Sequence, residues 1–306
     1  MSKKRKVIDV YGIVQGVGFR PFVYNLAIKN SLTGYVNNNS NGVIIDIQGE
    51  EDNLKAFIVE LSKNPPLLSK IKKVKITEKK VNQKYTDFYI KLTEKNISPT
   101  TYISPDYSIC DKCKTEIFDK NNKRYRYPFT NCTCCGPRFS IIKDLPYDRD
   151  LTTMNEFEMC ESCKAEYNNP ENRRFHAQPN ACPECGPIVF LSKSNGELIK
   201  YEDPLTETIK LIKEGNIIAV KGLGGFNLSC DAKNEETIRL LRKRKKRPQK
   251  PFAVMMRDLE VVKKYCNLSK EEEAVLLSNK RPIVLLEKNK NYGLPNNLAP
   301  NNKRVG

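Results

Sequence analysis

The sequence predicts an α+β protein with several domains, and three observations support this fold class. The chain has 306 residues, enough for about two ordinary domains that each bury a core of their own. Strand-like and helix-like patterns alternate over residues 1–91 and return over residues 200–306. Between these stretches, eight of the eleven cysteines form four C-x-x-C pairs, a spacing typical of thiolate ligands to a metal ion.

The pattern of residues 1–91 predicts a ferredoxin-like unit with the order βαββαβ and one layer of helices on one sheet. Apolar residues at helical spacing follow Arg20, and Pro21 suits the first turn of that helix. The stretch NNNSNG predicts a hairpin turn, because Asn and Gly tolerate positive φ. The predicted elements are strand 6–12, helix 21–30, strands 33–38 and 42–49, helix 50–63, and strands 71–79 and 85–92.

Residues 92–109 carry two prolines and little periodicity, which predicts a linker. Residues 110–190 hold the cysteine pairs, and residues 200–306 return to an α/β pattern. In that last stretch we expect strands at 216–222, 251–256 and 281–286, a glycine-rich turn at LGG, a helix from Asn234, and a helix capped by Ser269 with Glu272 in the capping-box position.

The cysteines belong to an internal repeat with a period of 50 residues, seen when CDKC-x18-CTCCGP is set beside CESC-x18-CPECGP. Two C-x-x-C knuckles can close one tetrahedral Cys₄ zinc site, and four protein ligands make such a site structural. Zinc is favoured over redox pairs or an iron–sulfur cluster, and the spacing leaves open whether ligands exchange between the repeats. The expected sets are Cys110, Cys113, Cys132 and Cys135, and then Cys160, Cys163, Cys182 and Cys185.

Two residues near these knuckles are expected to lie outside the metal sites. Cys134 is an odd thiol inside a knuckle, with adjacent packing expected and ligand exchange as the alternative. The single histidine, His176, is expected at the surface, because each repeat already supplies four thiolates.

The stretch VQGVGFR predicts an anion-binding loop. Gly16 and Gly18 allow backbone N–H groups to converge on a ligand, and the helix that follows adds its positive N-terminal end. Arg20 would add a planar fork suited to phosphate or carboxylate. Asn38, at the end of the next predicted strand, could orient a water molecule without repelling an anion, although turn geometry alone could also account for an Asn there.

Composition favours an anionic partner, since 53 Lys and Arg against 36 Asp and Glu give a net charge of +17. Seven basic residues fall between Arg242 and Lys250, which indicates a nucleoside triphosphate or RNA, and no Walker-type loop is present. No apolar run reaches the ~18 residues of a membrane span, and Asp9 interrupts the apolar run that a secretory signal would need. We therefore expect a cytoplasmic protein without a membrane partner.

Together, VYGIVQGVGFRPF and GYVNN resemble the acylphosphatases over residues 4–91. By that resemblance, Arg20 and the backbone amides of Gln15, Gly16, Val17, Gly18 and Phe19 hold the phosphoryl group, and Asn38 positions the attacking water. An acyl phosphate is already activated, so positioning and charge stabilisation can suffice without a metal.

The order of acylphosphatase domain, paired Cys₄ fingers, KGLGGFNLSCDA and KRKKRPQKPFAVM is similar to the N-terminal part of the hydrogenase-maturation carbamoyltransferases. The last segment resembles the threonylcarbamoyl-AMP synthases. The resemblance implies that carbamoyl phosphate is hydrolysed to carbamate, activated with ATP and Mg²⁺ as carbamoyl adenylate, and transferred to a C-terminal cysteine of a maturation partner. The nucleotide or anion ligands would then be Lys221, Lys245, Arg247 and Lys250.

The chain departs from that family because it ends before the adenylating domain would be complete and lacks the transfer domain. We therefore expect a fragment or one product of a split gene. Two alternatives remain open, a stand-alone acylphosphatase with appended domains and a zinc-containing protein that binds double-stranded RNA.

Overall fold

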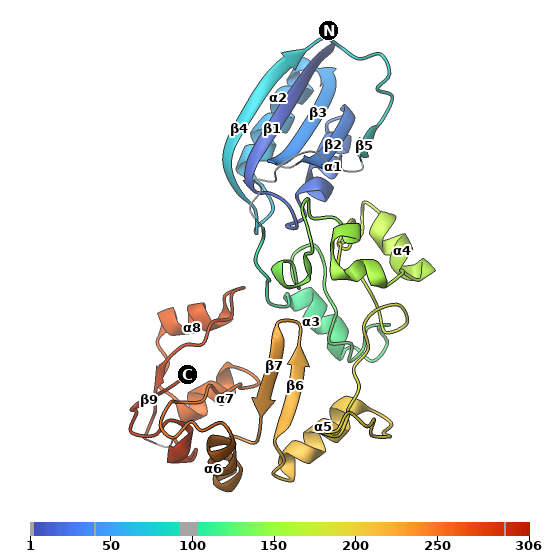
Figure 1. Ribbon diagram of the computed structural model, residues 1–306. Helices are drawn as coiled ribbons and strands as arrows, with labels where there is room; N and C mark the ends of the chain where they lie inside the picture. Colours follow the sequence, from blue (N-terminus) through green and yellow to red (C-terminus); the bar gives the residue numbers. More distant parts are fainter. Residues whose placement is uncertain (1–2, 40, 92–102, 291) are drawn as a thin grey trace. The chain divides into compact units, whose positions relative to one another are not determined.

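The computed structural model describes residues 3–39, 41–91, 103–290 and 292–306 (Figure 1). The chain divides into two compact units, Met1–Pro187 and Ile188–Gly306, which are described separately below. Within the described residues, no helix is long and apolar enough to cross a membrane.

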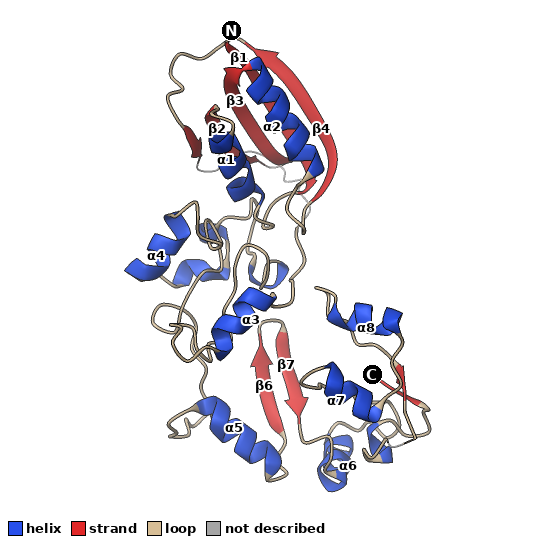
Figure 2. Cartoon of the chain, turned by 180° about the vertical axis from the view of Figure 1, so that it is seen from behind, coloured by secondary structure: helices blue, strands red, loops and turns tan. Residues whose placement is uncertain are grey.

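The first unit begins with a five-stranded sheet in the order β4-β1-β3-β2-β5. Neighbouring strands are antiparallel except β2 and β5, which run parallel at one edge. Helices α1 and α2 cover one face of the sheet, where Val23 and Phe57 pack on strand residues such as Ile45 (Figure 2). The elements are β1 (Lys3–Ile13), α1 (Phe19–Lys29), β2 (Thr33–Asn39), β3 (Gly42–Glu50), α2 (Glu51–Lys63), β4 (Lys70–Lys79) and β5 (Phe88–Ile90).

The predicted βαββαβ order is confirmed, and the further strand predicted at 85–92 is present as the shorter β5. The predicted linker lies largely outside the described residues, which omit 92–102. Its described end pairs with the cysteine repeats: Tyr107 and Gly136 each donate a backbone N–H to the other's carbonyl at 3.0 Å. This pairing holds the end of the predicted linker against the first repeat.

The two cysteine repeats, residues 110–136 and 160–186, are called here the finger segment together with the residues between them. Each repeat contains a short helix, α3 (Asp111–Phe118) or α4 (Glu161–Asn168), that starts directly after the first cysteine of its pair. Three 3₁₀ turns lie between the repeats, η1 (Phe139–Ile141), η2 (Arg149–Leu151) and η3 (Thr153–Glu156).

The repeats are joined by a reciprocal exchange of ion pairs. Arg124 of the first repeat pairs with Glu166 of the second at 2.5 Å, and Arg174 of the second pairs with Glu116 of the first. Burial alone would raise the pKa of Glu166, but the hydrogen bond and charge of Arg124, the hydrogen bond from Lys123 and the charge of Arg174 together outweigh it and lower the pKa to about 2. Each arginine is almost fully buried, so the exchange forms part of the interior of this small segment.

The second unit contains short elements around a small core that includes Ile238, Cys266 and Leu298. Its two sheets have two strands each. The elements are α5 (Pro204–Lys213), β6 (Ile218–Gly222), β7 (Gly225–Ser229), α6 (Glu235–Arg244), α7 (Leu259–Tyr265), α8 (Lys270–Leu277), β8 (Leu286–Glu287), η4 (Asn296–Leu298) and β9 (Arg304–Val305).

Several predictions for this unit hold. Asn234 caps α6 by accepting from Thr237 N, and Ser269 and Glu272 form the complete capping box of α8. The strand expected at 216–222 is present as β6.

Other predictions for the second unit are wrong. Residues 251–256 form no strand, because Phe252 N donates to Leu298 and Val254 N donates to Gly306, two separate partners instead of one neighbouring strand. Of the strand expected at 281–286, only Leu286 lies in a strand, the two-residue β8. The stretch after LGG forms β7, which pairs with β6 in a hairpin that was not predicted.

Candidate anion site and metal centres

The loop between β1 and α1 has the backbone conformation of an anion-binding turn. Gly16 has φ of 68° and Gly18 has φ of 76°, in the left-handed region that favours glycine. Gly18 is the N-cap of α1 and makes no side-chain cap, so the first amides of the helix are left to other acceptors. Such a loop before a helix N-terminus favours phosphate or carboxylate.

The same glycines also lie in close contact with the finger segment. A Cβ at Gly16 would lie 3.2 Å from the Arg138 side chain and from the Tyr147 ring. A Cβ at Gly18 would lie 3.2 Å from Thr133. The finger segment therefore packs directly on the anion loop.

The side chains of this loop hold it in place by hydrogen bonds and by packing in the core. Gln15 donates through Nε2 to the carbonyls of Asn39 and Gly42, at 2.8 and 2.7 Å, and accepts from Tyr147 N. Val17 and Phe19 are buried in the core of the first sheet. The groups of this loop that remain to bind a ligand are therefore its backbone N–H groups.

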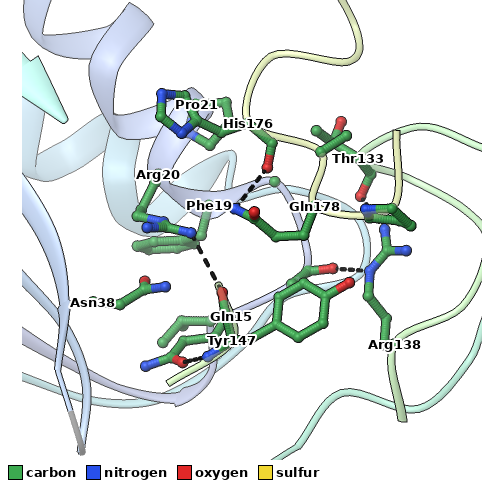
Figure 3. Close-up of a pocket in the computed structure, with 15 residues that line it drawn as sticks. Gln15, Phe19, Arg20, Pro21, Asn38, Thr133, Arg138, Tyr147, His176 and Gln178 are labelled. Carbon is green, nitrogen blue, oxygen red and sulfur yellow. Dashed lines mark hydrogen bonds between the residues drawn. The ribbon is translucent and has the colours of Figure 1, made fainter. Parts of the chain in front are cut away.

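Arg20 and Asn38 lie next to each other at this loop, as Figure 3 shows. With the Asn38 amide oriented so that its oxygen faces the guanidinium, that oxygen accepts from Nε and Nη2 of Arg20 at 3.2 Å. Arg20 Nη2 also donates to Asp148 Oδ1 at 2.7 Å. The guanidinium is thus held between the first sheet and the finger segment, and only 9% of its side chain is exposed.

Residues from both segments line one pocket. The first segment supplies Gln15, Gly16, Gly18, Arg20 and Asn38 among others, and the finger segment supplies Thr133, Arg138, Tyr147, His176 and Gln178. The finger residues were not predicted as part of the site, because no motif links them to a loop more than a hundred positions earlier. One signal was present in the sequence: the first repeat ends in CGPR and the second in CGPI.

His176 is half-buried and lines this pocket, so it is less exposed than the expectation of a surface position implied. Burial lowers the pKa of the imidazole to about 4, with a further lowering from Arg20 and an opposing effect of Asp148. The folded protein therefore binds fewer protons at this group than the unfolded chain does. Its contribution to stability is complete above pH 6.5, the ordinary value, and falls as the pH is lowered toward 4.

The chain has one histidine, so its imidazole signals are unique in an NMR titration. We expect a midpoint near pH 4 in the folded protein and a higher midpoint in Arg20→Ala, because a nearby positive charge is removed. Arg5→Lys, far from this group in an ion pair with Asp46, is the matched control and should leave the midpoint unchanged. A wild-type midpoint near 6.5 would contradict the burial of His176.

Both cysteine clusters fit zinc. In each cluster the four Sγ atoms lie within 4.8 Å of one another, and all four come from one repeat. Measured Sγ–Sγ separations include 3.8 Å between Cys132 and Cys135 and 3.7 Å between Cys160 and Cys182. A tetrahedron with Zn–S bonds of about 2.3 Å has edges of about 3.8 Å. The exchange of ligands between repeats that the spacing left open does not occur in this arrangement.

Guanidinium groups from the opposite repeat approach both clusters. Arg173 Nη1 donates to Cys113 Sγ at 3.0 Å, and Arg124 Nη2 donates to Cys163 Sγ at 3.4 Å. Such donors offset the negative charge that four thiolates place around a divalent ion. Cys134 lies outside the cluster and is exposed.

The four predicted nucleotide ligands lie in the second unit, and none of them lines the pocket described above. Lys221 lies on β6 with Nζ 5.2 Å from the centre of the Phe226 ring. Lys245 and Lys250 are exposed, whereas Arg247 folds back and donates to the carbonyls of Lys250 and Pro251. The neighbouring Arg242 is buried and donates to five backbone carbonyls, so part of the basic stretch has a structural role.

The family model for acylphosphatases matches residues 6–90. A curated acylphosphatase of Bacillus licheniformis is 41% identical over 91 residues, which are 29% of this chain and 98% of that protein. Residues 6–90 belong to the acylphosphatase family. The acylphosphatase segment is followed by two matches to the family described as HypF finger, at residues 109–142 and 159–192, and by a match of residues 210–306 to the family described as Telomere recombination.

Beyond the acylphosphatase segment, the chain as a whole is similar to HypF proteins. The probable carbamoyltransferase HypF of Methanocaldococcus jannaschii is 51% identical over 292 residues, 94% of this chain and 38% of that protein. A crystal structure of full-length HypF in the phosphate- and nucleotide-bound form matches with a TM-score of 0.93 and 49% identity, covering 100% of this chain and 40% of that one. The chain thus spans about two fifths of the length of these relatives.

Proposed function

We propose that the acylphosphatase segment hydrolyses an acyl phosphate and that Arg20 and Asn38 carry the reaction. The observation that supports this most directly is their contact beside a loop whose two glycines have positive φ, inside one pocket. The nearly complete match to stand-alone acylphosphatases gives independent support.

In this proposal the amides of residues 15–19 and the Arg20 guanidinium bind the phosphoryl oxygens and stabilise the charge that they carry in the transition state. Asn38, whose oxygen accepts from Arg20, would direct its amide N–H groups toward the attacking water. The water oxygen forms a bond to phosphorus, and the bond from phosphorus to the acyl oxygen breaks. The products are inorganic phosphate and a carboxylate, and the proton of the water passes to solvent.

We further propose carbamoyl phosphate as the substrate, because the relatives are named carbamoyltransferases. The carboxylate released is then carbamate. Residues 200–306 would contribute to its activation with ATP and Mg²⁺, and a hydrogenase-maturation protein would accept the carbamoyl group on a C-terminal cysteine. A relative crystallised in a phosphate- and nucleotide-bound form supports the use of both kinds of ligand, and Lys221, Lys245, Arg247 and Lys250 remain the proposed nucleotide ligands.

The proposed domains are the acylphosphatase domain 1–91, the linker 92–109, the fingers 110–190 with knuckle pairs at 110–135 and 160–185, and a partial adenylating domain from 200 to 306. The thiolate clusters also require reduced cysteines, which supports a cytoplasmic location. The names of the relatives give no support to the RNA-binding alternative.

The direct test is release of phosphate from carbamoyl phosphate by this chain, with and without ATP. Release should be independent of ATP, and Asn38→Ala should lower kcat by about 10²–10³-fold, because the group that orients the water is lost.

Asn37→Ala is the matched control for that experiment. Asn37 is the neighbouring residue of the same strand, faces the other side of the sheet, and does not line the pocket. Its Oδ1 is buried without a hydrogen-bond partner, so truncation removes no bond to that atom. Equal losses in the two variants would indicate damage to the fold and would remove Asn38 from the reaction.

A further inference from the structure

Arg138 is a buried arginine whose hydrogen bonds join the first metal cluster to the anion loop. It follows the CGP end of the first repeat and is 2% exposed. Nη2 donates to the carbonyls of Cys132 and Thr133 at 3.1 and 3.0 Å, and Nη1 donates to those of Cys135 and Pro137 at 3.1 and 2.8 Å. Nε donates to the carbonyl of Gly16, a contact drawn in Figure 3.

These contacts use all five N–H donors of the guanidinium. Arg138 therefore has no donor left for a ligand, although it lines the pocket. Its contribution must be to hold the groups that it contacts and to place a positive charge beside the site. Arg138 is a positioning residue.

Arg138 connects the first metal cluster to the anion loop, so we expect a shift of one to move the other. On one side are the carbonyls of Cys132 and Cys135, two of the four cysteines of the first cluster. On the other is Gly16, where a Cβ would already lie 3.2 Å from Arg138 Cδ. A change in the position of the first cysteine knuckle is thus transmitted to the anion loop through the hydrogen bonds and the close contact of Arg138.

The positive charge of Arg138 also favours a thermodynamic link between the first metal cluster and the anion loop. Within the described part of the chain, its side chain forms no ion pair with a carboxylate, and its partners are neutral carbonyl oxygens. The positive charge of Arg138 contributes to lowering the pKa of Asp106, whose carboxylate accepts the backbone N–H of Arg138 at 2.7 Å. An anion in the pocket would add a further negative charge and so stabilise the arrangement of Arg138 that the knuckle requires.

We propose that the first Cys₄ cluster and the anion loop are thermodynamically coupled through Arg138. A metal ion bound by that cluster holds the loop in its anion-binding form, and an anion bound in the loop slows release of the metal. Linkage makes the two effects reciprocal. The second cluster serves as an internal comparison, because Ile188 occupies the position of Arg138 in the second repeat. The inference rests on the proposed function only in taking the anion to be a phosphoryl group.

The test is the rate at which the zinc-loaded chain loses zinc to a chromogenic chelator, with inorganic phosphate or with sodium chloride at equal ionic strength. We expect two phases, one of them slowed about fivefold or more by phosphate. Arg138→Lys keeps the positive charge but loses the five hydrogen bonds of the guanidinium. Both phases of zinc release should then be independent of phosphate. Should that variant fail to hold two zinc ions, Arg20→Ala still tests the coupling itself, because it weakens the anion site without touching the cluster; a phosphate effect that persists in Arg20→Ala would overturn the coupling.

Phosphate binding is measured separately by calorimetry on the same samples. If phosphate binds the wild-type chain and zinc release does not change, the coupling is wrong and the proposed function stands. If phosphate does not bind at all, the coupling is wrong, and the proposed function is decided separately by the release of phosphate from carbamoyl phosphate. A phosphate effect that persists unchanged in Arg138→Lys also overturns the role of Arg138.

Discussion

Replacing Arg20 with lysine should lower kcat/KM for carbamoyl phosphate by at least about a hundredfold, and replacing it with alanine by about a thousandfold. The lysine keeps a positive charge but presents it at a single point, whereas the guanidinium is a planar fork that can match two phosphoryl oxygens. In the folded chain that fork is oriented by Asn38 at 3.2 Å and by Asp148 at 2.7 Å. A lysine ammonium has three N–H donors at one point, too few to keep both contacts and also bind two phosphoryl oxygens.

The measurement is phosphate release at several substrate concentrations, so that kcat and KM are obtained separately. Arg5→Lys is the matched control, since Arg5 forms its own two-bond pair with Asp46, at 2.8 and 2.6 Å, and does not line the pocket. Its activity should stay close to that of the wild type. Activity of Arg20→Lys within a few-fold of wild type would show that charge alone is needed and that the fork has no role.

The second large effect is expected from Cys113→Ser, which should leave the chain with one zinc ion instead of two and unfold much of the first repeat. Cys113 is completely buried, and the core of that repeat consists mainly of cysteines. Helix α3 has 8 residues, too few to be stable by itself in water. Metal binding, worth about 10–16 kcal/mol in small zinc domains, therefore supplies most of the stability here.

Metal analysis gives the zinc content, and hydrogen exchange followed by peptide mapping locates the loss of structure. Protection should disappear over residues 103–136 and remain in β1, β3 and β4, whose core does not depend on the cysteines. Cys134→Ser is the matched control, because Cys134 lies in the same knuckle but outside the cluster. Loss of zinc from Cys134→Ser, or two zinc ions retained by Cys113→Ser, would contradict the ligand assignment.

The sequence predicted those parts of the fold that depend on local periodicity or on fixed spacing. The strands and helices of the first sheet follow from apolar residues at regular intervals, and the cysteine clusters follow from the C-x-x-C pairs. The stretch 251–256 has the composition of a strand, but a strand also requires a partner of similar length. Its backbone finds two unrelated partners, which composition cannot reveal.

Only the part of the site that comes from the first sheet and its loop could be predicted from the sequence. Arg20, Asn38 and the glycines stand in one short region, so their association can be proposed from the sequence. Arg138 lines the pocket from the finger segment and Asp148 accepts from Arg20, both through contacts across more than a hundred residues. These contacts depend on how the two segments pack, and nothing in the periodicity of either segment encodes that packing.

The exchange of Arg124 and Arg174 with Glu166 and Glu116 gives the two fingers the relationship of two subunits in a symmetric dimer. Each finger presents one arginine and one glutamate to the other, and the same surface is used on both sides. A single finger separated from its neighbour would expose a buried arginine and its glutamate without partners, and that surface would be complementary to a second copy of itself. The repeat is therefore not a string of independent modules: its smallest complete unit is the pair.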